Sequence, residues 1–143
     1  MPVSTRGTVI IVEDDPSMSQ ALKRILRLGG FDSRLYPTGE ALLDEDRARP
    51  SICMIFDVQL PGVNGFVLRD RLASLGVLPP VIFITAFDEP DARAHAAQAG
   101  AAAFLVKPFA GRLLLETVRR AVEGSSSGGA SAQRLVRPQS DED

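Results

Sequence analysis

The sequence predicts an α/β fold: a doubly wound, five-stranded parallel sheet with helices on both faces. Short apolar runs of strand length alternate along the chain with longer segments whose apolar residues recur at helical spacing. Glycine, proline and capping residues separate the two kinds of segment. Strands that alternate with helices of this length require right-handed crossovers, and these place helices on both faces of the sheet.

The first strand and helix have clear boundaries. Residues 9–12 form a continuous β-branched run, which is typical of a strand buried on both faces. Asp15 is suited to cap a helix that has Pro16 at its first position, and Gly29 ends that helix. The apolar residues at helical spacing within it are Met18, Leu22 and Ile25.

The next elements differ in polarity. Residues 32–36 are mixed, which favours a strand near the sheet edge, and Thr38 is suited to cap a helix that runs to about Arg47. The apolar run 51–56 predicts a buried third strand, and Asp57 follows it directly. Taken alone, Asp57 is equally well explained as a residue that caps a turn.

The second half repeats the pattern. After the loop 61–65, a helix is expected from about Asn64 to Leu75, and the buried strand 81–84 then ends at Thr85. An alanine-rich helix over 91–99 follows, in which His95 is expected to face solvent. The remaining expected elements are a strand over 103–106, closed by Lys107 and Pro108, and a helix over 110–123. The five repeats form a flavodoxin-like (βα)5 arrangement, for which we expect the strand order 2-1-3-4-5.

Composition narrows the class of protein. The 143 residues suggest one folded domain over residues 1–123, followed by a flexible Ser/Gly-rich tail or linker over 124–143. A net charge of −2 argues against direct contact with nucleic acid, and no segment has the length of a membrane span or the pattern of a signal peptide. We therefore expect a cytoplasmic protein. The single cysteine, Cys53, excludes an internal disulfide and is expected to pack in the core.

Polar residues stand at the ends of four predicted strands, and in a parallel sheet these ends share one edge. They are Glu13 and Asp14 after the first strand, Asp57 after the third, Thr85 after the fourth and Lys107 after the fifth. Two carboxylates about 4 Å apart repel by roughly 4 kcal/mol at an effective dielectric constant near 20, so these acids can share a pocket only if a cation joins them or one of them is protonated. Oxygen ligands with few protein groups favour Mg²⁺, and aspartate is a nucleophile for phosphoryl transfer.

Four stretches in this order resemble the receiver domain of two-component response regulators over about residues 7–123. They are IIVEDDP at 10–16, FDVQLPGVNG at 56–65, IFITA at 82–86 and GAAAFLVKPF at 100–109. The resemblance implies that Asp57 is the phosphoacceptor and that Mg²⁺ is bound by Glu13, Asp14, Asp57 and the backbone carbonyl of Gln59. It further implies that Thr85 and Phe104 form the conformational switch, that Lys107 pairs with the phosphoryl group, and that the Lys107–Pro108 peptide bond is cis.

The implied function is a signalling switch. A sensor histidine kinase or a phosphotransfer protein donates the phosphoryl group to Asp57, and slow self-dephosphorylation reverses the reaction, with no other enzyme activity. The face formed by the fourth helix, fifth strand and fifth helix then changes its contacts with partners, which include a possible homodimer. Two residues depart from the common pattern, because Glu13 replaces an aspartate and Phe104 lacks the hydroxyl of a tyrosine.

Two other functions are compatible with parts of this pattern. A haloacid-dehalogenase-type phosphohydrolase also uses an aspartyl phosphate, but it carries a second aspartate where this chain has Gln59. A flavin-binding module has the same topology, but the acids at 13–15 would repel the flavin phosphate. The sequence does not identify the kinase, the downstream target or the oligomeric state.

Overall fold

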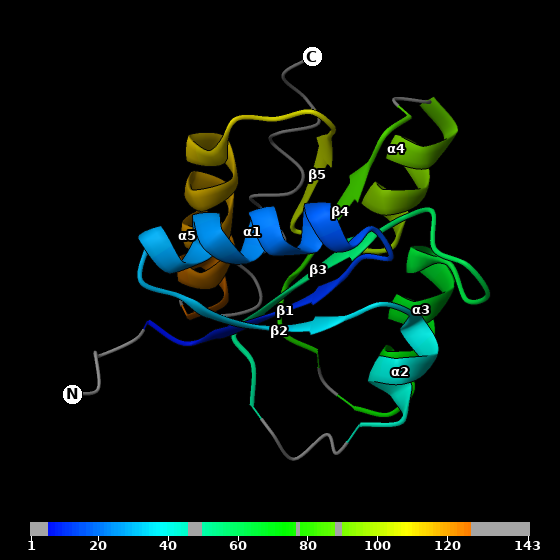
Figure 1. Ribbon diagram of the computed structural model, residues 1–143. Coiled ribbons are helices and arrows are strands. Elements are labelled where there is room, and N and C mark those ends of the chain that lie inside the picture. Colours follow the sequence, from blue (N-terminus) through cyan, green and yellow to red (C-terminus); the bar gives the residue numbers. More distant parts are fainter. Residues whose placement is uncertain (1–5, 46–49, 77, 88–89, 127–143) are drawn as a thin grey trace.

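A computed structural model describes residues 6–45, 50–76, 78–87 and 90–126, and it has the predicted architecture (Figure 1). Five parallel strands pair in the order β2-β1-β3-β4-β5. The strands are β1 (Thr8–Val12), β2 (Asp32–Tyr36), β3 (Cys53–Asp57), β4 (Val81–Thr85) and β5 (Ala103–Val106). The helices are α1 (Pro16–Leu28), α2 (Gly39–Leu43), α3 (Gly65–Ala73), α4 (Pro90–Gln98) and α5 (Gly111–Ser126).

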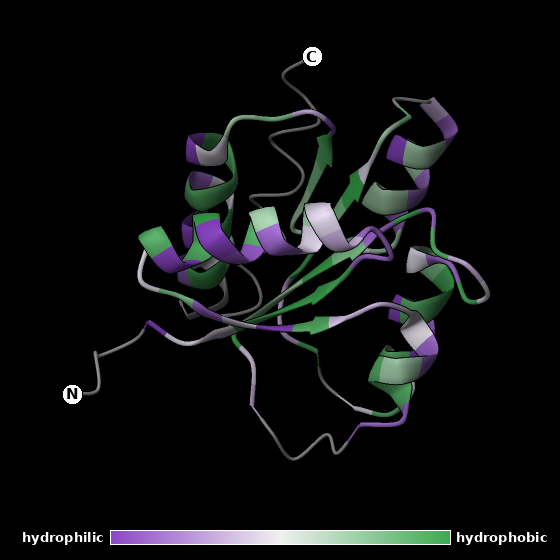
Figure 2. Cartoon of the chain, in the orientation of Figure 1, coloured by the Kyte–Doolittle hydropathy of each residue, from purple (hydrophilic) through white to green (hydrophobic). Residues whose placement is uncertain are grey.

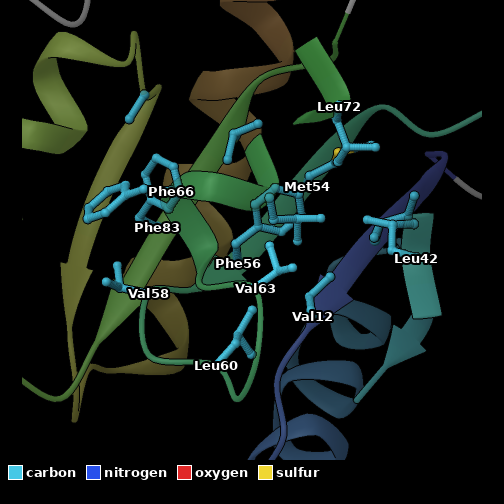
Figure 3. Close-up of a cluster of buried hydrophobic side chains, with 14 of the residues drawn as sticks. Val12, Leu42, Met54, Phe56, Val58, Leu60, Val63, Phe66, Leu72 and Phe83 are labelled. Carbon is cyan, nitrogen blue, oxygen red and sulfur yellow. The ribbon is translucent and has the colours of Figure 1, made fainter. Parts of the chain in front are cut away.

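The sheet separates two hydrophobic layers. On one face, α1 and α5 cover the sheet through Leu22, Leu26, Leu114 and Val118. On the other face, α2, α3 and α4 cover a layer that is rich in phenylalanine (Figure 3). The central strands are hydrophobic along their length, as a sheet covered on both faces requires (Figure 2).

Capping residues fix where three helices begin. The side chains of Asp15, Thr38 and Asn64 accept hydrogen bonds from the backbone N–H groups of Ser17, Ala41 and Val67 at 3.0, 3.1 and 2.9 Å. Each cap satisfies a donor that the first helical turn leaves without a partner. The predicted caps at Asp15 and Thr38 are confirmed, and Asn64 is a cap rather than the first residue of its helix.

Two helix predictions need correction. We expected α2 to reach about Arg47, but it ends at Leu43 with Asp44 as its C-cap, because the acidic residues after Leu43 offer no apolar side chain to bury; Arg47 itself lies outside the described residues. We expected α3 to reach Leu75, but it ends at Ala73, and the Leu75 side chain is 58% exposed instead of joining the buried face.

Other differences are smaller. Helix α5 continues to Ser126, three residues beyond its predicted end, and the rest of the predicted tail, 127–143, lies outside the described residues. His95 is exposed, as predicted, but its ring also stacks on Phe66 of α3, with the ring centroids 4.0 Å apart. Cys53 is buried, as predicted, and this burial raises the pKa of its thiol to about 12. Among the described residues, the helices are too short or too polar to cross a bilayer.

Candidate functional site

The parallel register brings the predicted polar residues to one edge of the sheet. Val12 pairs with Phe56, so Glu13, which follows β1, and Asp57, the last residue of β3, lie at the same level of neighbouring strands. Asp57 pairs with Ile84, and Thr85 pairs with Val106, which places Lys107 beside the same edge. The structure thus gathers side chains that are up to 94 positions apart in the sequence.

Lys107 joins the two buried acids of this edge. Its Nζ lies 2.9 Å from Oδ2 of Asp57 and 3.0 Å from Oε1 of Glu13. The Lys107–Pro108 peptide bond is cis, as predicted, and the Lys107 backbone N–H donates to the Thr85 carbonyl at 2.7 Å. Burial alone would lower the pKa of Lys107, but the hydrogen bonds to Asp57 and Glu13 outweigh it and raise that pKa. Lys107 therefore carries its charge at neutral pH.

Both carboxylate oxygens of Asp57 have a partner. Oδ1 accepts a hydrogen bond from the backbone N–H of Gln59 at 2.9 Å, and Oδ2 accepts from Lys107. The residue is 5% exposed, so most of its carboxylate is withdrawn from water. These two bonds hold the carboxylate in one orientation at the mouth of the site.

Glu13 is almost completely buried, at 2% exposure. Its Oε1 accepts from Lys107, and its Oε2 accepts from the Asp15 backbone N–H at 3.1 Å. Its backbone carbonyl accepts from the Ser19 hydroxyl at 3.2 Å, which ties the loop to α1. Burial raises the pKa of Glu13, although the bond to Lys107 works in the opposite direction.

Glu13, Asp14 and Asp57 form a candidate cation site. Each offers one carboxylate oxygen, and the three oxygens lie within 4.8 Å of one another. Asp14 is exposed, whereas the other two are buried, so the site opens to solvent on the side of Asp14. A set of oxygen ligands with an open side fits Mg²⁺, which retains several of its waters.

Thr85 is the last residue of β4 and is fully buried. The hydroxyl donates to Oε1 of Gln59 at 3.4 Å and accepts from the Phe87 backbone N–H at 3.1 Å. Thr85 is thus linked to Asp57 through Gln59, whose backbone and side chain each make one of the two contacts. The resemblance implies a role only for the carbonyl of Gln59, although an aspartate side chain that accepts from the backbone N–H two positions later is a known turn pattern.

Phe104 does not join the polar cluster. It is half-buried on β5, packs against the hydrophobic layer beneath α4, and has the guanidinium carbon of Arg93 5.1 Å from its ring centroid. Because α4 carries Arg93 and β5 carries Phe104, this contact connects two elements of one face of the molecule. This contact could not be predicted, because Arg93 and Phe104 belong to different predicted elements.

The backbone of Gly65 packs directly against the backbone of Asp57 and Val58. A Cβ atom at this position would lie 2.5 Å from the backbone carbonyl oxygen of Asp57. The Gly65 N–H donates to the Val58 carbonyl at 3.0 Å, which closes the loop after β3 against the start of α3. Gly65 falls where the predicted loop 61–65 overlaps the start of the predicted helix, and neither prediction includes the close approach to Asp57 that excludes a side chain here.

Comparison with known proteins shows a family and a fold that this chain shares. The family model described as the response regulator receiver domain matches residues 9–119. A crystal structure of a response regulator receiver protein from Burkholderia phymatum has 40% sequence identity and a TM-score of 0.74, over 82% of this chain and 96% of that one. The structure of FixJ-N has 28% identity and a TM-score of 0.75, over 86% of this chain and 96% of that one.

Curated relatives are longer than this chain. Nodulation protein W of Bradyrhizobium diazoefficiens is 34% identical over 93% of this chain and 58% of its own length. Response regulator protein FleR of Pseudomonas aeruginosa is 35% identical over 84% of this chain and 25% of its own length. The match therefore covers one part of each of these proteins.

Proposed function

We propose that this chain, which belongs to the response regulator receiver domain family, is a switch controlled by phosphorylation of Asp57. The observation that carries the proposal is the pairing of the buried Asp57 carboxylate with Lys107, next to two further acids. A carboxylate held in one orientation beside a fixed cation is prepared to act as a nucleophile and to retain the charged product.

The phosphoryl donor is a phosphohistidine of a sensor histidine kinase or a phosphotransfer protein. A carboxylate oxygen of Asp57 attacks the phosphorus, the P–N bond breaks, and the imidazole departs with its electron pair and takes up a proton. Hydrolysis of the acyl phosphate by water returns Asp57 and inorganic phosphate. Lys107, which holds Oδ2 of Asp57 at 2.9 Å, is placed to pair with the added phosphoryl oxygens.

Mg²⁺ would be held by Glu13, Asp14, Asp57 and the backbone carbonyl of Gln59. When bound, the ion neutralises negative charge on the transferring phosphoryl group. The burial of Glu13 and Asp57 favours a dication, because two buried carboxylates share only one ammonium group, that of Lys107.

Thr85 and Phe104 would transmit the signal. Phosphorylation offers the Thr85 hydroxyl new acceptors in place of Gln59, and its movement changes the packing space available to Phe104. The face made by α4, β5 and α5 then changes its preference for a protein partner or for a second copy of the chain. Phe104 takes part through packing and through Arg93, since it has no hydroxyl to donate.

Acetyl phosphate with Mg²⁺ tests the proposal. We expect an increase in intact mass by one phosphoryl group in the wild-type chain, and none in Asp57→Asn or in wild type with EDTA. Asp14→Asn, which leaves Asp57 in place, should label much more slowly. Equal labelling of wild type and Asp57→Asn would refute the proposal. Rapid multiple-turnover hydrolysis of phosphate esters would instead favour a phosphohydrolase.

A further inference from the structure

A basic pocket of about 310 Å³ lies at the amino-terminal ends of β1 and β2, whereas Asp57 lies at the carboxyl end of its strand. We call it the edge pocket, and its polar lining consists of Thr8, Lys23, Arg27, Asp32, Ser33 and Arg34. Its lining residues come mainly from the second half of α1 and the start of β2. Figure 1 shows these two segments side by side, with β2 as the outermost strand of the sheet. The described residues around it belong to β1, β2, α1 and the α1–β2 turn.

The edge pocket is separate from the candidate phosphorylation site. Thr8 begins β1 and Glu13 follows its last residue, so five residue steps of about 3.3 Å separate the two ends, or about 16 Å. The two sites also have opposite charge. Three acids, Asp57 among them, gather at the phosphorylation site beside one lysine, whereas three cations and one acid line the edge pocket.

Charge alone favours an anion here. Lys23, Arg27 and Arg34 against Asp32 give the lining a formal charge of +2, although the whole chain has a formal charge of −2. A local excess of positive charge on an acidic protein attracts anions to that place and not to the rest of the surface.

A buried donor in the lining supplies a second, independent observation. The Ser33 hydroxyl lies on the face of the sheet that α1 covers, is buried, and has no hydrogen-bond partner in the part of the chain that the structure describes. Nε of Arg34 is also buried without such a partner, but successive side chains of a strand point to opposite faces, so this atom lies on the other face. Buried polar groups are nearly always paired, because an unmade bond is costly, and the Ser33 hydroxyl can donate.

We propose that the edge pocket binds a phosphate-type oxyanion. Such a group carries up to two negative charges, which match the lining, and its oxygens accept hydrogen bonds from hydroxyl, guanidinium and ammonium donors at once. Phe31, the aromatic residue of the lining, is only 3% exposed and so offers no face on which a nucleobase could stack. The ligand is therefore small: free phosphate or a simple phosphate monoester.

Titration of the full chain with inorganic phosphate tests this inference, with EDTA present so that the acids around Asp57 hold no metal. We expect saturable binding, which NMR detects as changes in the amide chemical shifts of Ser33 and Arg34. Arg27→Gln should weaken it by roughly tenfold or more, the loss of one charge-assisted contact. Arg24→Gln, on the same helix but outside the lining, is the matched control and should bind like wild type.

Ser33→Ala distinguishes a ligand site from a merely structural feature. Because the Ser33 hydroxyl makes no hydrogen bond within the described protein, its removal should weaken phosphate binding without lowering stability in phosphate-free buffer. Parallel titrations with methyl phosphate separate the two sources, since a monoester site binds it at least as tightly as free phosphate.

Three results would overturn the inference: no saturable binding at millimolar phosphate, equal binding by wild type and Arg27→Gln, or equal weakening by Arg24→Gln. The result is independent of the proposed function. Asp57→Asn abolishes labelling by acetyl phosphate in that proposal, yet it should leave phosphate binding in the edge pocket unchanged.

Discussion

Nζ of Lys107 lies 2.9 Å from Oδ2 of Asp57, so a side chain at the end of β5 neutralises one at the end of β3, with β4 between the two strands. The same ammonium group also neutralises Glu13 at 3.0 Å. One cation thus pairs with two buried carboxylates. The stability of the fold therefore depends on Lys107, the residue that the proposed chemistry also uses.

Replacing Lys107 by methionine should destabilise the fold by about 2 kcal/mol, because it leaves two buried carboxylates unpaired. Urea unfolding in EDTA measures the change. Added Mg²⁺ should restore part of the loss by neutralising the same acids. Lys23→Met removes the other lysine of the chain and should change stability by no more than about 0.5 kcal/mol. A similar loss in both variants would contradict the prediction.

The raised pKa of Glu13 predicts a pH dependence of known sign. Burial raises this pKa above its ordinary value of 4.5, so the folded state holds the proton more tightly than the unfolded state. The contribution of Glu13 to stability is fully present below pH 4.5, and it is lost as the pH rises through the folded pKa. Glu13→Gln should remove this component, because glutamine does not titrate. Urea unfolding across that pH range should show that the free energy of unfolding depends less on pH in the variant than in wild type.

Thr85→Val tests the switch separately from the chemistry. It keeps the shape of the side chain but removes the acceptor of the Phe87 N–H and the donor to Gln59, at a cost of about 1 kcal/mol. We expect acetyl phosphate to label the variant, while the spectral change that beryllofluoride induces in wild type is lost. Ser74→Ala, which removes an exposed hydroxyl at the end of α3, is the control and should retain both responses. A full beryllofluoride response in Thr85→Val would remove Thr85 from the switch.

Gly65→Ala should lower stability by about 1–3 kcal/mol, because the new methyl group would lie 2.5 Å from the Asp57 carbonyl oxygen, which belongs to the backbone and cannot move aside freely. The shift of Asp57 should also slow its labelling. Gly111→Ala is the matched control, since its Cβ would lie 3.3 Å from a flexible side-chain atom of Ile25. Thermal unfolding and labelling rates compare the two variants, and equal behaviour would show that the Gly65 contact is unimportant.

Arg93→Gln should loosen the orientation of Phe104. An exposed cation–π contact contributes about 0.5–1 kcal/mol, so its loss shifts the balance between ring orientations by roughly two- to fivefold. We expect beryllofluoride to reach half-saturation at a correspondingly lower concentration. Arg93→Lys retains a cation and should resemble wild type. An unchanged half-saturation point in Arg93→Gln would show that the contact does not restrain Phe104.

The sequence was sufficient for the topology because each element has its own signal. Continuous apolar runs mark the inner strands, the mixed run 32–36 marks β2 at the edge, and caps such as Asp15 mark helix starts. Helix ends were harder to predict, as Leu43 and Ala73 show, because an amphipathic pattern fades gradually while the last turn depends on local hydrogen bonds.

Some features of the candidate site could be predicted from the sequence, and others could not. The residues that stand at strand ends, such as Asp57 and Lys107, were predictable, because parallel strands bring their ends together. The contacts of Gln59 and Gly65 depend on the path of a loop, and the stacking of His95 on Phe66 depends on how α4 lies against α3. No periodicity in the sequence encodes such relations between elements.

The division of the core into two layers also divides the phenylalanines. Phe56, Phe66, Phe83 and Phe104 lie in or against the layer beneath α2–α4, whereas Phe31 and Phe109 lie in or against the layer beneath α1 and α5. The chain has seven phenylalanines and no tryptophan. Uniform incorporation of fluorophenylalanine would therefore give a small set of ¹⁹F resonances that belong to distinct sides of the sheet. A signalling event could be followed on one side, with the other side as its internal reference in the same spectrum.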